Sequence, residues 1–81
     1  MDDAEVIRRI NELAEEEHRL EQAASHGQPV SDEDHARLRQ VEVALDQCWD
    51  LLRQRRARRA SGQDPDEAEV RSEGVVEGYQ Q

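Results

Sequence analysis

The sequence is poor in the residues that build large apolar cores. It has no Phe, one Trp and one Tyr, and its Leu, Ile and Val residues number fifteen among 81. Twelve of these fifteen lie between Val6 and Leu52, so a packed core can form only in that part of the chain. The length leaves room for one small domain and excludes a multi-domain enzyme.

Further absences exclude other classes of protein. No apolar run approaches the roughly 20 residues that span a bilayer. The first residues, MDDAEVIRRI, lack the basic start and apolar stretch of an export signal. Cys48 is the only cysteine, which excludes an intrachain disulfide and a cysteine-built zinc site. We therefore expect a cytoplasmic protein with no membrane partner.

Charge is abundant and predominantly acidic. The formal net charge is -9, and all eleven basic residues are arginine. Residues 61–81 hold six acids, three glycines and a single base, Arg71. Such a composition is typical of a segment that stays mostly irregular. We expect an acidic tail there, with a possible short helix at 65–70, because Asp64, Pro65 and Glu67 form a helix-start pattern.

A capping pattern and an apolar stripe predict a first helix over residues 3–25. Asp2, with Glu5 three residues later, forms a capping box. The stripe follows at three- and four-residue spacing and consists of Val6, Ile10, Leu13, Glu17, Leu20 and Ala24. Gly27 and Pro29 then predict a turn within residues 25–31.

Ser31, followed by three acids, predicts the start of a second helix over residues 32–60. Its apolar positions are candidates for helix packing or for a dimer interface: Leu38, Val41, Leu45, Cys48, Trp49, Leu51 and Leu52. Two long helices joined by a short turn fold back on each other. The sequence thus predicts an all-α fold, an antiparallel two-helix hairpin with an acidic, mostly irregular tail.

One hairpin of this size has a thin core. We expect its two packed stripes to leave five apolar residues wholly or partly uncovered: Ile7, Ala14, Val43, Ala44 and Leu51. A homodimer that forms a four-helix bundle, with Trp49 and Leu51 near the interface, is the economical way to cover them. The alternative is a tail that folds over the second face. Its candidate docking residues are Val75, Val76 and Tyr79, which we expect near the open end of the hairpin.

Five arginines close the second helix: Arg53, Arg55, Arg56, Arg58 and Arg59. One interpretation is a phosphate-binding patch. The other is that these cations complement the helix dipole and pair with Asp2, Asp3 and the acidic tail. We favour the second interpretation, because the first helix with its cap residue Asp2 carries a net charge of -5, and so does the tail. The tail acids expected to fold back onto the arginines are Asp64, Asp66, Glu67 and Glu69.

The remaining patterns point away from catalysis. Glu15 and His18 have the Glu-x-x-His spacing of dimetal sites, which Asp32 and His35 imitate, but Glu15 lies opposite the apolar stripe. Glu17 interrupts that stripe, and we expect a register-setting role or a salt bridge to Arg37. Cys48 is expected to be a buried packing residue. Without a nucleophile elbow or a Gly-rich phosphate loop, we predict a non-enzyme with no metal and no cofactor.

Several segments resemble a small actinobacterial family of proteins of about this length. These segments are DDAEVIRRINELAEEEH, SDEDHARLR, ALDQCWDLLRQRRARRA, DPDEA and VVEGY. The family is known only as a domain of unknown function. The resemblance implies an actinobacterial source and one compact unit that includes the arginines and the VVEGY end, but it implies no activity, ligand or site.

These observations favour a non-catalytic protein-interaction adaptor or regulator. Its expected partners are a second copy of the chain and an unidentified protein. The alternative is a nucleic-acid- or ribosome-associated protein that uses the arginines of the second helix.

Overall fold

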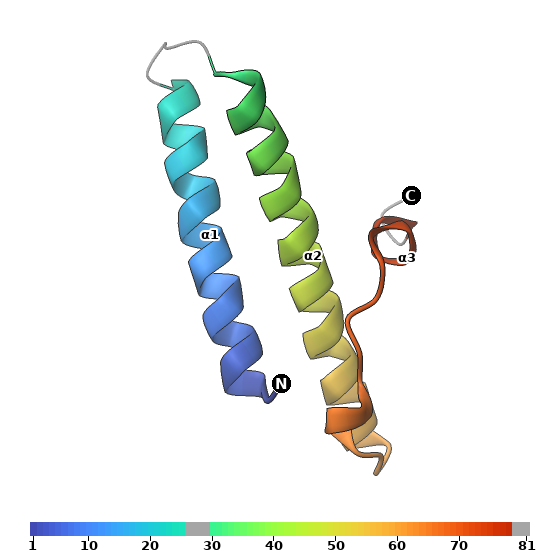
Figure 1. Ribbon diagram of the computed structural model, residues 1–81. Helices are drawn as coiled ribbons and strands as arrows, with labels where there is room; N and C mark the ends of the chain where they lie inside the picture. The colour runs from blue at the N-terminus through green and yellow to red at the C-terminus, as the bar shows by residue number, and fades with distance from the viewer. Residues whose placement is uncertain (26–29, 79–81) are drawn as a thin grey trace.

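The fold is a hairpin of two long helices with the C-terminal segment packed against it (Figure 1). The computed structural model describes residues 1–25 and 30–78. Its elements are α1 (Asp3–Ser25), α2 (Asp32–Ala60), the 3-10 helix η1 (Pro65–Glu67) and α3 (Glu73–Glu77). The predicted all-α antiparallel hairpin is confirmed, with both long helices in the expected ranges. The expected turn residues Gly27 and Pro29 lie outside the described residues.

Side-chain caps fix where the two long helices begin. The Asp2 Oδ1 atom accepts a hydrogen bond from the Glu5 backbone N–H at 2.8 Å. The Ser31 Oγ atom accepts one from the Asp34 N–H at 3.1 Å. Each bond satisfies an N–H group that the helix itself leaves without a partner. Helix α2 ends where Gly62 adopts a positive φ of 78°, a conformation that glycine reaches without a steric penalty.

The core is concentrated toward the open end of the hairpin, where α1 begins and α2 ends. Val6 and Ile10 of α1 form one buried cluster with Leu51 and Leu52 of α2. Leu45, Cys48 and Ala68 pack against it while partly buried. Leu13 and Val41 are buried farther along the helix pair. Each such aliphatic side chain stabilises the fold by about 1.5–3 kcal/mol.

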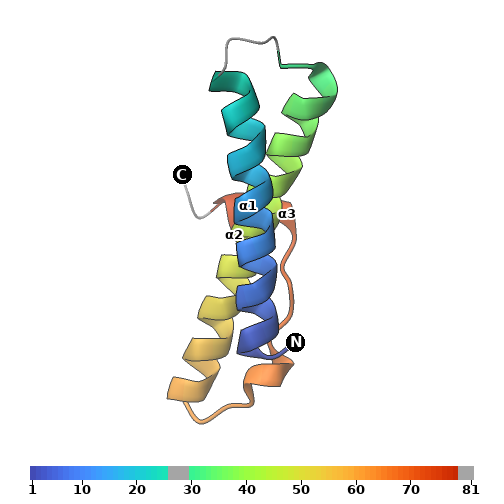
Figure 2. The same cartoon turned by 90° about the vertical axis from the view of Figure 1, so that its left-hand side faces the viewer.

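The C-terminal segment runs back along α2, on the side away from α1 (Figures 1 and 2). Helix α2 therefore lies between α1 and the tail. This arrangement buries residues on two sides of α2, including Asp50 and Arg55 as well as Leu51 and Leu52. The tail is thus part of the folded unit and not a solvated extension.

The short helix expected at 65–70 is present in shorter form, as the 3-10 helix Pro65–Glu67 with Asp64 as its cap. The helix at Glu73–Glu77, capped by the Ser72 side chain, was not expected. Two expectations about this region are wrong. Leu51 is not uncovered: it is 4% exposed and belongs to the buried cluster with Val6, Ile10 and Leu52, against which Ala68 of the tail packs. The tail valines do not lie at the open end, because α3 packs against the middle of α2, where Arg39 contacts Glu73 at 3.4 Å.

None of the helices in the described part of the chain combines the length and apolar character needed to cross a bilayer.

Candidate functional site

The arginines at the end of α2 differ in their burial and in their ion-pair partners. Arg55 is buried, and its Nε donates to the Asp3 Oδ1 atom at 2.6 Å. Its Nη1 donates to the Asp66 Oδ1 atom at 2.9 Å and to the Pro65 carbonyl at 3.2 Å. Arg55 therefore joins the start of α1 to η1. Hydrogen bonds from Arg55 and Arg59 lower the pKa of the Asp3 carboxyl group.

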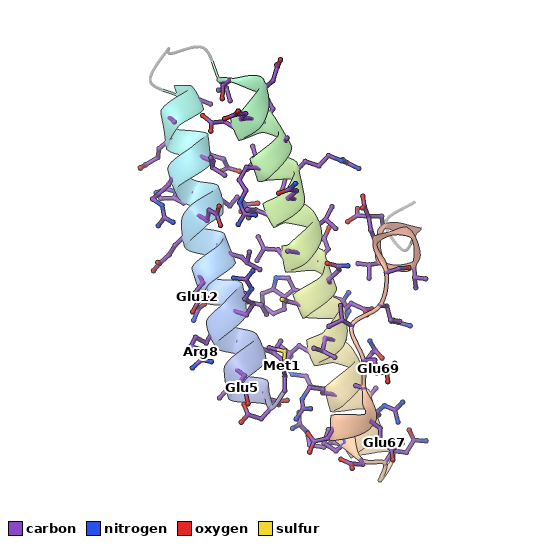
Figure 3. All side chains as sticks on the ribbon, in the orientation of Figure 1. Met1, Glu5, Arg8, Glu12, Glu67 and Glu69 are labelled. Atoms are coloured by element: carbon purple, nitrogen blue, oxygen red, sulfur yellow. The ribbon has the colours of Figure 1, made fainter. Side chains whose placement is uncertain are left out.

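The other members of the cluster are more exposed. Arg59 also binds Asp3, and Arg58 approaches Glu67 at 3.5 Å. Figure 3 shows Glu67 and Glu69 on the tail beside the end of α2. Among the described residues, the ion pairs of the cluster involve Arg55, Arg58 and Arg59, so Arg53 and Arg56 remain as exposed cations.

A second ion pair, which the sequence did not suggest, ties the tail to the middle of α2. Asp50 is only 2% exposed, and both of its carboxylate oxygens accept hydrogen bonds from Arg71, one of them from Nε at 2.8 Å. The Gln54 side chain donates to Asp50 at 2.9 Å and to the Glu69 carbonyl at 2.8 Å. The hydrogen bonds from Arg71 lower the pKa of Asp50 despite its burial. We call this network the Asp50–Arg71 clasp.

Three carboxylates gather in the other half of the hairpin, and the described residues show no ion pair between them and a cation. Oxygen atoms of Glu17, Glu21 and Glu42 lie within 4.8 Å of one another, and we call these three residues the acidic cluster. Burial, and then the neighbouring charges of Glu21, Glu42 and Asp46, raise the pKa of Glu17. The expected Glu17–Arg37 salt bridge is wrong, because Arg37 donates instead to Glu16, its Nη2 at 2.7 Å from Oε1. Arg37 lies on the opposite edge of the helix pair from the acidic cluster.

The acidic half extends to α3. There the Asp46 carboxylate faces Glu77, and the side-chain hydrogen bond that a proton allows between them raises the pKa of Glu77. Glu73 adds a further negative charge, and Arg39 is the cation whose field opposes it. Val76 of α3 is buried, whereas Val75 is half exposed. Tyr79, the third candidate docking residue, lies outside the described residues.

One broad face of the hairpin combines exposed apolar groups with charges of both signs. Ile7, Ala14 and Glu21 lie in one row on α1, because residues seven apart share a side of a helix. Glu42, Trp49 and Arg56 form the equivalent row on α2. The contact between Glu21 and Glu42 places the two rows on the same face. We call this surface, of the six residues above, the Trp49 face.

The centre of the Trp49 face is open to solvent. Trp49 is 45% exposed and Ile7 is 42% exposed. Among the other candidate packing residues of α2, Val41, Leu51 and Leu52 are buried, and Leu38, Leu45 and Cys48 are partly buried against the hairpin. Trp49 is therefore the candidate interface residue of α2 that the fold leaves accessible.

The opposite face carries a shallow groove of about 290 Å³ between α1, α2 and the tail. Its lining includes Met1, Cys48 and Val70. Burial raises the pKa of the Cys48 thiol, which disfavours the reactive thiolate. Cys48 thus acts here as a packing residue against the core cluster of Val6, Ile10, Leu51 and Leu52.

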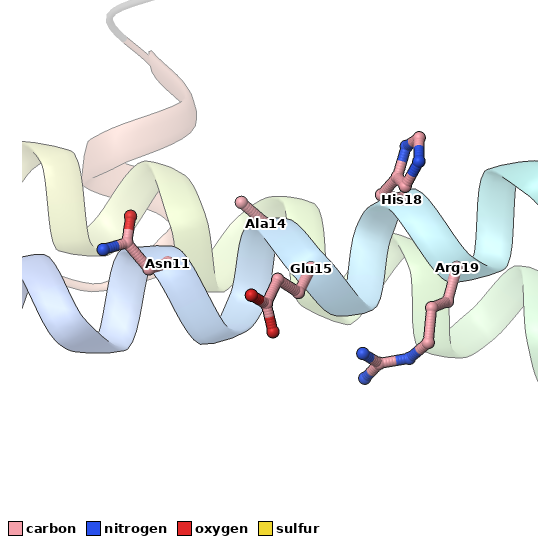
Figure 4. Close-up of a pocket in the computed structure, with 5 residues that line it drawn as sticks. All are labelled: Asn11, Ala14, Glu15, His18 and Arg19. Atoms are coloured by element: carbon pink, nitrogen blue, oxygen red, sulfur yellow. The ribbon is translucent and has the colours of Figure 1, made fainter.

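The outer side of α1 is polar and solvent-facing. Figure 3 shows Glu5, Arg8 and Glu12 on the side away from α2. Figure 4 shows a shallow hollow on this surface, where Glu15 and His18 point to different sides of the helix. The Glu-x-x-His spacing therefore does not bring these two side chains together.

The comparisons with known proteins match almost the whole chain. A family model described as a protein of unknown function (DUF2630) matches residues 2–81. Uncharacterized proteins of Mycobacterium bovis and Mycobacterium tuberculosis are 49% identical to the chain over 77 residues. The aligned part covers 95% of this chain and 88% of each relative. No solved structure matches the chain.

Proposed function

The chain belongs to the DUF2630 family of proteins of unknown function, and from its surfaces we propose that it is a non-catalytic protein-interaction adaptor or regulator. It acts in the cytoplasm, in keeping with its single, unpaired cysteine. The binding surface is the Trp49 face.

The observation that carries this proposal is the exposure of Trp49 on a folded helix. A tryptophan that is 45% exposed between charged neighbours leaves a large apolar area in water. Tryptophan is also enriched among the residues that dominate binding energy at protein interfaces. Binding to a partner protein would bury the apolar surface of the Trp49 indole, which the fold of the single chain leaves in water.

The pairing of the arginines disfavours the nucleic-acid alternative. Nucleic-acid affinity comes largely from cations that displace counterions from phosphates. Arg55 is buried between Asp3 and Asp66, and Arg59 binds the same Asp3. An incoming phosphate would have to break these pairs. Arg53 and Arg56 remain accessible, and they are the residues through which the alternative, a nucleic-acid- or ribosome-associated protein, would act.

Capture of partners from a mycobacterial cell extract tests the proposal. The tagged full-length chain is used before and after nuclease treatment of the extract. We expect nuclease-resistant capture of protein that falls about tenfold or more in Trp49→Ala, because losing a central aromatic side chain costs much of an interface's binding energy. The control variant Arg8→Gln/Arg19→Gln, at exposed positions of α1 outside the Trp49 face, should retain that capture.

The reverse pattern would contradict the proposal. If nuclease abolishes capture, and Arg53→Gln/Arg56→Gln loses it while Trp49→Ala keeps it, the protein is a nucleic-acid binder. Circular dichroism of each variant establishes that the helices are intact.

A further inference from the structure

We propose that the Trp49 face binds a second copy of this chain in antiparallel orientation. This inference rests on the proposed function, because it names a partner for the same face. Three features of the face point to this partner: the spacing of its charges, their signs, and the position of its apolar centre.

The spacing on α2 is symmetric about Trp49. Glu42 precedes Trp49 by seven residues, and Arg56 follows it by seven. With a rise of 1.5 Å per residue, each charge lies about 10.5 Å from Trp49 along the helix, in opposite directions. A twofold axis that crosses the face at Trp49, at right angles to α2, therefore sets Arg56 of one copy opposite Glu42 of the other. Symmetry repeats this contact, so one geometry forms two ion pairs.

Neighbouring residues strengthen the complementarity. The acidic cluster adds Glu17 and Glu21 to Glu42, and within the chain no facing cation among the described residues compensates their charges. At the other end of the face, Arg53 lies one turn from Arg56, and both are exposed. The antiparallel arrangement brings these two arginines against the acidic cluster of the second copy. It thus places cations beside the three carboxylates that lie within 4.8 Å of one another.

The signs of the charges on the Trp49 face also favour the antiparallel orientation of the two copies. If two copies met with their helices parallel, the acidic cluster of one would face the acidic cluster of the other. Like charges placed together across an interface cost several kcal/mol and suppress that mode of binding. The antiparallel mode has attraction at both ends.

The apolar centre lies on the proposed axis. Across the helix pair, Glu21 is next to Glu42, and antiparallel register then sets Ala14 beside Trp49 and Ile7 beside Arg56. The small Ala14 leaves room for an indole from the second copy, and Ile7 borders it. Although η1 and α3 pack against α2, the described residues leave Trp49 and Ile7 exposed on this face. A stable interface needs roughly 800 Å² per partner, which is available on a molecule whose longest dimensions are 51 and 26 Å.

The mass of the full-length chain in solution is the first test. Analytical ultracentrifugation from micromolar to millimolar concentration should show a species of twice the 9.4 kDa chain mass. Because Trp49 is the only tryptophan, its fluorescence emission should shift to shorter wavelength as the dimer forms. Trp49→Ala should weaken the dimer by about tenfold or more.

A charge-swap experiment tests the orientation. Arg53→Glu/Arg56→Glu and Glu21→Arg/Glu42→Arg should each raise the dimer Kd about tenfold or more when studied alone. An equimolar mixture should recover a heterodimer, because every reversed charge then meets its complement. Arg8→Glu/Arg19→Glu, on exposed positions of α1, is the control that makes the same change in net charge as the first variant and should leave the Kd unchanged.

A 9.4 kDa monomer over the whole concentration range would overturn the inference. So would a dimer that is insensitive to the Trp49 and charge-reversal variants, because it would use another face. These results are distinct from failure of the proposed function. If the chain is a monomer but still captures other proteins through Trp49, only the inference of self-association is wrong. If capture is nuclease-sensitive and depends on the arginines, the proposed protein-interaction function is wrong.

Discussion

At the open end of the hairpin, acids of α1 and of the tail lie against arginines of α2, whereas in the other half carboxylates of α1, α2 and α3 lie against one another. Asp3 and Asp66 both bind Arg55 at the open end. Among the residues that the structure describes, no cation forms such a pair with the acidic cluster. The hydrogen bonds to arginine lower the pKa of Asp3, while burial and like charges raise the pKa of Glu17.

The two groups of carboxylates therefore have opposite effects on the stability of the folded state. A carboxylate with a lowered pKa stabilises the folded state at neutral pH, and one with a raised pKa destabilises it. A cost of this kind is common at sites that serve binding, where activity and stability conflict. The acidic cluster lies on the Trp49 face, so its cost fits a surface that a cationic partner completes.

The largest effect should come from removing the cation of the Asp50–Arg71 clasp. Arg71→Ala leaves the buried carboxylate of Asp50 without its strongest partner. Breaking a fully buried pair costs 3–5 kcal/mol, but the Arg71 side chain is 37% exposed and solvent screens part of the interaction. We therefore expect a loss of about 2 kcal/mol, measured by urea unfolding, together with faster amide exchange in α3.

The exposed pair between Arg39 and Glu73 supplies the control for the clasp. Arg39→Ala removes a cation that also links α2 to α3, but both side chains are largely in solvent. Its cost should stay below about 1 kcal/mol. An Arg71→Ala variant that is no less stable than Arg39→Ala would show that the clasp does not anchor the tail.

Arg55→Ala should have the next largest effect, because Arg55 joins Asp3 of α1 to Asp66 of η1. Its removal takes away the ion-pair partner of Asp66 and leaves Asp3 with Arg59 alone. We expect a lower midpoint of urea unfolding than in Arg53→Ala, a matched substitution at an exposed arginine two positions away on the same helix. Equal midpoints for the two variants would contradict the division of the arginine cluster into structural and accessible members.

The helices could be predicted from the sequence because their signals are local. The pairing of Asp2 with Glu5, the cap at Ser31 and the three- and four-residue spacing of apolar residues depend only on nearby positions. These signals also determine which side of α1 faces α2. Val6 and Ile10 were expected on that side, and both are buried there.

The path of the tail could not be predicted, because it depends on contacts between distant residues. Asp50 and Leu51 lie away from the centre of the hairpin seam, so the helical pattern alone leaves them uncovered. Asp50 is paired with Arg71, which lies 21 positions away in the sequence, and Leu51 belongs to a cluster that includes Val6 and Ile10 and against which Ala68 packs. The sequence shows the arginines as one cluster. Which of them are buried, such as Arg55, and which are exposed, such as Arg53, depends on where η1 packs and could not be predicted.

The pH dependence of stability should reflect both the carboxyl groups with raised pKa values and those with lowered pKa values. Glu17 and Glu77 have pKa values raised above the ordinary glutamate value of 4.5, by burial and by Asp46 respectively. As pH falls from 7 toward 4.5, the folded state takes up protons before the unfolded state does, so these groups make folding more favourable. Asp3 and Asp50 have pKa values lowered below 3.8 by their arginine partners. Their contribution is present above pH 3.8 and is lost as the pH falls through their folded-state pKa values.

Urea unfolding at a series of pH values should therefore give stability that holds or rises slightly from pH 7 to about 5 and falls steeply below about 4. Glu17→Gln/Glu77→Gln should abolish the rise, and Asp50→Asn should reduce the loss at low pH. A steady decline from pH 7 downward in the wild-type chain would contradict the raised pKa values.

The smallest predicted effect, and the one that isolates the acidic cluster, is a gain in stability for Glu17→Gln. The amide keeps the shape of the side chain and removes its repulsion with Glu21 and Glu42. Because Glu17 is only partly buried, we expect a gain of about 0.5 kcal/mol at pH 7. The gain should vanish below about pH 4, where the wild-type carboxyl group is itself protonated. Glu15→Gln removes the same charge from an exposed position of α1 and should give a smaller gain.

Both variants are measured in the Trp49→Ala background, so that self-association does not mask the repulsion. A loss of stability in Glu17→Gln in this background would show that Glu17 already has a partner within the folded chain.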